Sequence, residues 1–144
     1  MPDIKHDETH TGRGEMSAQI STGAVQLLSE YTGRGPTRAH TLINRDSVTI
    51  VLRDTLTKGE RSLVAAGKSD EVLRSRSAYQ QVMKGDLTDL VERAVERKVT
   101  AFLSANHLDP DVGVEFFLLE SLAEDHRWDG AGDSGEVAAN RISA

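Results

Sequence analysis

The segment Gly33-Arg34-Gly35-Pro36-Thr37-Arg38-Ala39-His40 combines glycines and guanidinium groups in a pattern that could bind an anion. Its backbone NH groups and the side chains of Arg34 and Arg38 could donate hydrogen bonds to a phosphate or a carboxylate. The segment follows an expected helix, however, and the negative end of a helix dipole repels anions. A helix cap followed by a rigid proline turn is the alternative interpretation. The candidate ligand-binding residues are Gly33, Arg34, Gly35, Thr37, Arg38 and His40.

A second polar cluster contains one imidazole and three carboxylates within ten residues, namely His107, Asp109, Asp111 and Glu115. These groups could bind a divalent ion, or His107 could act as a base that an acid orients. Their spacing matches no recognised metal motif, and Asp109-Pro110-Asp111 is typical of a turn, so a solvated hairpin turn is the alternative. We assign no metal, no cofactor and no catalytic residue. The sequence leaves catalysis undecided and favours a chain that is not an enzyme.

Composition indicates one domain with two polar ends. The chain has 144 residues, of which 38% are apolar, enough for one core. Aromatic residues are few, and Phe102, Phe116 and Phe117 are expected to be the largest members of that core. We expect a disordered arm over residues 1–15, a single domain over 16–121 and a disordered acidic tail over 122–144.

Charge and cysteine content limit the classes of partner. The net charge is −6, and residues 17–120 carry 14 acids against 13 bases, so no nucleic-acid partner is expected. The sequence contains no cysteine, which suits a reducing compartment. Neither an apolar leader nor a run of about 20 apolar residues is present, so no direct membrane insertion is expected. We expect a cytoplasmic protein that reaches a membrane through a partner.

Periodicity predicts three helices. The first begins at a Ser17 cap and ends before Gly33, and the second follows the capping box Thr57-Lys58-Gly59-Glu60 to about Ala66. The third begins at a Ser69 cap, and Gly85 within it indicates a bend or a close helix contact. One apolar face is expected along this third helix, formed by Val72, Tyr79, Val82, Met83, Leu87, Leu90, Val91 and Ala94.

Alternation and turn residues predict four strands, over residues 38–44, 48–53, 99–105 and 112–120. The order of elements is α-β-β-α-α-β-β. Because the connections between successive strands are short, they favour antiparallel hairpins. The expected fold class is α+β, with a four-stranded, mainly antiparallel sheet and helices packed on one face.

Three ordered blocks of this sequence resemble a known bacterial family. They are Gly33-Arg34-Gly35-Pro36-Thr37, Leu56-Thr57-Lys58-Gly59-Glu60, and Ala101 to His107 followed by Glu115 to Glu120. Together they resemble the MpsC-like family, which takes its name from a Na+-translocating membrane potential-generating system and was formerly a domain of unknown function. The resemblance covers about residues 17–121 and implies no catalytic residues.

The resemblance implies an accessory or regulatory protein that supports a membrane cation-translocating system. Its expected partners are proteins, namely a second copy of itself in a homodimer and a membrane transport complex. Two alternatives stay open. One is an anion-sensing or small-ligand-sensing module that uses the loop from Gly33 to Arg38, and the other is a metal-dependent enzyme centred on His107.

Overall fold

The computed structural model describes residues 7–35 and 38–122, which form three helices and one sheet. The elements in chain order are α1 (Asp7–Thr32), β1 (Arg38–Ile43), β2 (Ser47–Arg53), α2 (Lys58–Ala65), α3 (Ser69–Val95), β3 (Val99–His107) and β4 (Val112–Leu119). The fold is therefore α+β with the expected order of elements. The proposed arm and tail boundaries stay predictions, and residues 1–6 and 123–144 lie outside the described part.

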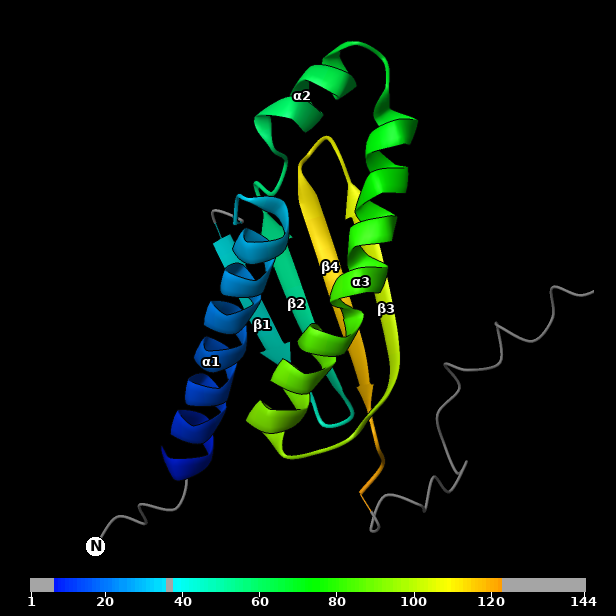
Figure 1. Ribbon diagram of the computed structural model, residues 1–144. Helices are drawn as coiled ribbons and strands as arrows, with labels where there is room; N and C mark the ends of the chain where they lie inside the picture. The colour runs from blue at the N-terminus through cyan, green and yellow to red at the C-terminus, as the bar shows by residue number, and fades with distance from the viewer. Residues whose placement is uncertain (1–6, 36–37, 123–144) are drawn as a thin grey trace, which may run out of the picture.

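The four strands form one antiparallel sheet in the order β1-β2-β4-β3. Figure 1 shows α1 and α3 lying across the same face of this sheet, with α2 at the end where the β3–β4 hairpin turns. Helices on one face were expected, and this prediction is confirmed. We call the other face, which no described helix covers, the open face.

Strand alternation determines which side chains enter the core. In β2, Val48, Ile50 and Leu52 are buried, and in β4 the residues Phe117 and Leu119 lie on the same helix-covered side. The helices add Ile20 and Ala24 from α1, and Met83, Leu87, Val91 and Ala94 from α3. The expected role of Phe116 in this core is wrong, because alternation turns it to the open face beside the buried Phe117.

Two of the expected helix ends are confirmed. The residue after α1, Gly33, has a φ of +79° and donates its backbone NH to Ser29 O at 2.9 Å. Thr57 and Glu60 form the reciprocal capping box of α2, with Glu60 N to Thr57 Oγ1 at 3.1 Å and Thr57 N to Glu60 Oε1 at 2.9 Å.

The two helix starts expected at serine caps are wrong. The helix α1 begins at Asp7, ten residues before Ser17, and includes Gly12 and Gly14. Each glycine costs about 1 kcal/mol, which does not stop a helix that gains a backbone hydrogen bond with each added residue. In α3, Ser69 is the first helical residue, and the cap is Lys68, which makes no side-chain capping bond.

The sheet-facing side of α3 also differs from the expected apolar face. Tyr79 and Val82 are 43% and 65% exposed, whereas Gln80 is buried. Tyr79 and Val82 each precede a buried residue by one position, which turns them about 100° around the helix. The expected close contact at Gly85 is wrong as well, because a Cβ there would meet no atom within 4 Å.

The close approach between helices occurs instead at Gly23 in α1. A Cβ at this position would lie 2.5 Å from Cδ1 and 2.8 Å from Cδ2 of Leu90 in α3. Tyr31 then links the same two helices nearer the end of α1, donating its hydroxyl to Oδ2 of Asp86 at 2.6 Å. The glycine and this hydrogen bond set how α1 lies against α3 above the sheet.

Candidate ligand-binding site

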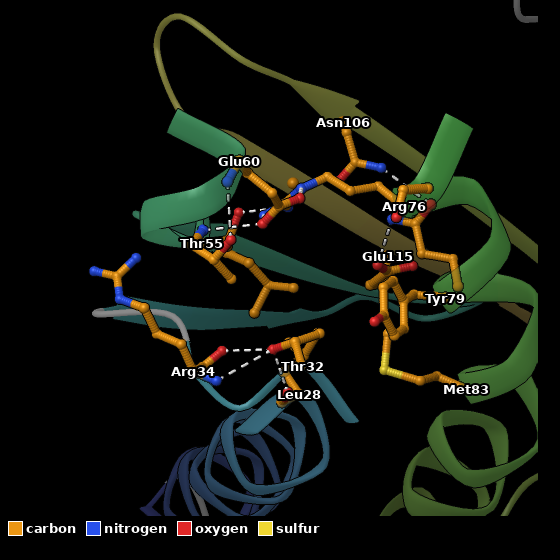
Figure 2. A pocket seen from close by; sticks show the side chains of 15 residues that line it. Leu28, Thr32, Arg34, Thr55, Glu60, Arg76, Tyr79, Met83, Asn106 and Glu115 are labelled. Carbon is orange, nitrogen blue, oxygen red and sulfur yellow. Dashed lines mark hydrogen bonds and ion pairs between the residues drawn. The ribbon is translucent and has the colours of Figure 1, made fainter. Parts of the chain in front are cut away.

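A cavity of about 230 Å³ lies between the helix layer and the sheet, near the end of α1. Its walls come from α1, the loop after it, β2, the segment before α2, α2 itself, the first half of α3, and the two strands of the β3–β4 hairpin. The lining residues are Leu28, Thr32, Arg34, Leu52, Thr55, Thr57, Glu60, Ser75, Arg76, Tyr79, Gln80, Met83, Asn106, Gly113 and Glu115. Figure 2 shows ten of these with labels.

Glu115 is the buried acid of this cavity. Its place in β4 is set by alternation, because Gly113, Glu115 and Phe117 all point to the helix-covered side. Only 2% of the Glu115 residue surface is exposed. Figure 2 shows its side chain rising from the sheet into the cavity, on the side where Tyr79 and Met83 line it.

One oxygen of Glu115 is hydrogen-bonded and the other is not. Gln80 donates Nε2 to Glu115 Oε1 at 3.1 Å, and Asn106 donates Nδ2 to Gln80 Oε1 at 3.0 Å. The second oxygen, Oε2, has no hydrogen-bond partner among the described residues. Ser104, which pairs with Glu115 in the β3–β4 register, has a buried hydroxyl that likewise meets hydrogen-bond geometry with no group in this part of the chain.

This environment changes the acidity of Glu115. Burial raises the pKa of its carboxyl from 4.5 to about 7, and the polar groups of Ser104 and Gln80 offset part of the rise. Ser104 lies directly opposite Glu115 in the register, so its hydroxyl is near enough to act on the charge of Glu115. The carboxyl exchanges its proton near neutral pH. Such a group can serve a binding site either as a neutral hydrogen-bond donor or as an anion.

Arg76 joins α3 to α2 at the edge of the cavity. Its Nε donates to Glu60 Oε2 at 2.8 Å and its Nη2 to Glu60 Oε1 at 3.0 Å, while Nη1 reaches Thr55 Oγ1 at 2.6 Å. Partial burial of Glu60 opposes its ionisation, but this ion pair and the capping bonds with Thr57 outweigh burial and lower its pKa. The guanidinium is thus already paired with a carboxylate.

Of the described residues in the loop after α1, Arg34 alone lines the cavity. Its guanidinium donates to the carbonyl oxygen of Leu56 and pairs with Asp54 Oδ2 at 3.2 Å. Gly33 ends the helix, and a Cβ at Gly35 would lie 3.2 Å from the backbone oxygen of Val25. Thr37 lies outside the described residues.

The other basic residues of this candidate set do not converge with Arg34. Arg38 and His40 are exposed on β1, on the open face, and Arg38 borders a separate shallow hollow. The geometry observed at the loop is that of a helix cap. The ligand-binding role suggested for these residues stays a prediction.

The second candidate cluster is divided between the two faces of the sheet. His107 points to the open face and its Nδ1 lies 2.8 Å from Pro110 O, whereas Glu115 points into the cavity. Asp111 holds the segment before α2, accepting from Thr55 Oγ1 and from Leu56 N, each at 2.9 Å. Within residues 7–35 and 38–122 no three His, Asp or Glu side chains are grouped to hold a metal ion.

Sequence reasoning missed two cavity residues for which a signal exists. Arg76 lies seven residues before Met83, and Gln80 lies seven residues before Leu87, so both fall on the buried side of α3. The buried residues of α3 are Val72, Gln80, Met83, Leu87, Val91 and Ala94. Polar residues at these positions must either find partners inside the protein or line a cavity. Strand alternation likewise places the polar residue Glu115 at a buried position of β4.

These features define a class of protein, namely an α+β domain in which helices cover one face of an antiparallel sheet and enclose a buried carboxylate. The chain belongs to the MpsC family. The model of that family, described as Na+-translocating membrane potential-generating system (MpsC), matches residues 12–121. Comparisons with curated proteins and with solved structures returned no match.

The family match confirms the resemblance seen in the three sequence blocks. It covers all of the described elements except the first residues of α1. In the described residues, none of the helices combines the length and the apolar character that crossing a bilayer requires.

Proposed function

We propose that this chain is a cytoplasmic accessory protein that docks on a component of a Na+-translocating, membrane potential-generating system. The observation that carries the proposal is the family match over residues 12–121. A surface for such docking is available on the open face of the sheet. The alternative of a metal-dependent enzyme centred on His107 finds no support in the geometry, because His107 and Glu115 lie on opposite faces.

The open face supports docking on a partner protein. It presents an apolar surface formed by Leu42, Val51, Leu103, Val114, Phe116 and Leu118, and Leu103 is 64% exposed. Contiguous exposed apolar surface on a folded protein commonly marks an interaction site. A second layer packed on this face would bury these side chains as the helices bury those of the other face.

Charge at one end of the open face indicates the chemistry of the partner. Arg38 of β1 and Arg53 of β2 are directly opposite in the register and both exposed. Like charges in this position repel each other, and the carboxylates of Asp109 and Asp111, which line the same hollow, offset part of this repulsion. A carboxylate supplied by a partner would offset more of it. The proposed partner surface is therefore apolar with an acidic group at one end.

A co-purification experiment tests this proposal. The tagged chain is expressed at native abundance and recovered from detergent extracts, with Leu103→Asp as the test variant and Val82→Asp as the control. The control is matched because Val82 is 65% exposed but lies on α3, away from the open face. We expect a membrane protein to accompany the wild type and the control, and to be lost from Leu103→Asp.

Two results would contradict the proposal. One is recovery of no membrane protein with the wild type, and the other is equal recovery with Leu103→Asp. Light scattering on the same variants distinguishes a homodimer. If Leu103→Asp only converts a dimer into a monomer, the open face is a self-association surface and the proposed docking is wrong.

A further inference from the structure

The buried carboxylate of Glu115 is a polar group left incomplete by the protein itself. It is almost fully buried, since 2% of its surface is exposed, and its Oε2 meets hydrogen-bond geometry with no described residue. Ser104, directly opposite in the register, lowers the pKa of Glu115 but leaves Oε2 open to a further partner. Buried polar atoms in folded proteins are nearly always hydrogen-bonded, and an unpaired one costs free energy. Since Oε2 belongs to a side chain that lines a cavity, a molecule in that cavity can supply the missing partner.

The charges around the cavity favour a cationic partner. Arg76 is paired with Glu60 through two hydrogen bonds, and Arg34 is paired with Asp54. Glu115 has no salt bridge within the described part of the chain. Asp54 is shared with Arg61, but Glu115 is the one acid of the described wall that has no basic partner. An anion placed beside Oε2 would therefore meet a carboxyl group rather than a guanidinium.

The size and lining of the cavity favour an organic ion over water or a bare metal ion. A single water needs only about 10–15 Å³ of such space, against about 230 Å³ present here. Apolar surface comes from Leu28, Leu52 and Met83, and the ring of Tyr79 lies on the same wall as Met83. An aromatic ring attracts an organic cation by its quadrupole, and a thioether adapts to an apolar stem. No acidic or histidine side chains cluster in the described residues to ligate a metal.

We propose that this cavity binds a small organic molecule carrying a protonated amine, whose ammonium group pairs with Oε2 of Glu115 while its apolar stem lies against Met83 and Tyr79. The other oxygen, Oε1, already accepts a hydrogen bond from Gln80, and Asn106 holds Gln80 in turn. The binding group is therefore held in one orientation before the ligand arrives, which reduces the entropy lost on binding. The site does not depend on docking at the open face.

Titration with n-butylamine tests the proposal, with n-butanol and butyrate as probes of similar size but different charge. The side-chain amide NMR signals of Gln80 and Asn106 report on the site, because both amides belong to the hydrogen-bond chain that ends at Glu115. We expect butylammonium to shift both signals saturably and to raise the melting temperature. Butanol and butyrate should bind at least about tenfold more weakly, since each lacks the charge-assisted hydrogen bond.

Three variants distinguish the site from non-specific binding. Glu115→Gln keeps the size of the side chain and should weaken butylammonium at least about tenfold. Glu71→Gln removes an exposed acid from the first turn of α3 and should leave the affinity unchanged. A third variant, Gly113→Val, adds a side chain at the cavity wall and leaves Glu115 in place, and it should also weaken binding.

The pH dependence gives an independent readout. The titratable groups on the cavity wall are Arg34, Glu60, Arg76, Tyr79 and Glu115. Burial raises the pKa of Glu115 to about 7, so its carboxyl gains negative charge between pH 6 and pH 8, and butylammonium should bind more tightly at pH 8 than at pH 6. The proposal is overturned if no amine shifts the two amides, if butanol or butyrate binds as tightly, or if Glu115→Gln binds as the wild type does.

Discussion

At the scale of single residues, the main feature is the buried carboxyl of Glu115 in the cavity. Alternation along β4 turns it toward the helices, and the polar groups there satisfy only one of its oxygens. Because Glu115 is buried, its ionised form lowers the free energy of unfolding of the protein. The free energy of unfolding should therefore report its titration.

Glu115→Gln should remove a loss of stability that the wild type shows as the pH rises. The folded pKa of about 7 lies above the value of 4.5 for an exposed glutamate, so the folded chain binds the extra proton between these pH values. Wild-type stability should fall from about pH 4.5 to pH 7 and then level off, by on the order of 3 kcal/mol. Urea unfolding at pH 5 and pH 8 measures the difference.

The matched variant for this experiment is Glu71→Gln, which should keep the wild-type difference between pH 5 and pH 8. Glu60 does not confuse the result, because its pKa is lowered and its stabilising effect is lost only at more acidic pH. If Glu115→Gln loses as much stability as the wild type between pH 5 and pH 8, Glu115 is not the buried acid described here.

At the scale of elements, the position of α1 depends on a residue without a side chain. The side chain of Leu90 in α3 already fills the space that a Cβ at Gly23 would need. Gly23→Val should destabilise the fold by about 1–3 kcal/mol, because a branched side chain must displace Leu90 or move the helix. Gly85→Val is the control, since a Cβ at Gly85 meets open space.

Thermal unfolding of the two glycine variants measures this effect. We expect a clear fall in melting temperature for Gly23→Val and little change for Gly85→Val. Equal melting temperatures would show that Leu90 moves aside without cost and that Gly23 does not fix the position of α1.

Local patterns predicted most of the elements because each depends on a few neighbouring residues. The alternation of Val48, Ile50 and Leu52 predicted β2, and Thr57 and Glu60 predicted the start of α2. The serine caps were wrong because a helix can extend past a favourable cap when the residues before it also form backbone hydrogen bonds.

The cavity could be predicted only in part. Arg34 and Glu115 were chosen as candidates, but in two separate clusters, and the structure places both on the wall of one cavity. Their approach depends on how the loop after α1, α3 and the β3–β4 hairpin pack together, which short-range spacing does not report. Gln80 entered no candidate set because the face of the third helix was defined by its apolar residues alone.

At the scale of the whole molecule, the two faces of the sheet have different roles in this account. The helix-covered face encloses the core and the cavity, and the open face is the proposed docking surface (Figure 1). Since Leu103 and Glu115 lie on opposite faces, a Leu103 variant should leave amine binding intact, and a Glu115 variant should leave docking intact. Docking and amine binding can therefore be tested separately.

The membrane potential of living cells tests the central claim most directly. Cells that lack this chain are complemented with the wild type, Leu103→Asp or Val82→Asp at equal abundance, and the Na+-dependent potential is measured with a voltage-sensitive dye. We expect the potential to fall without the chain, to recover with the wild type and Val82→Asp, and to stay low with Leu103→Asp. An unchanged potential without the chain, or full recovery with Leu103→Asp, would contradict the account.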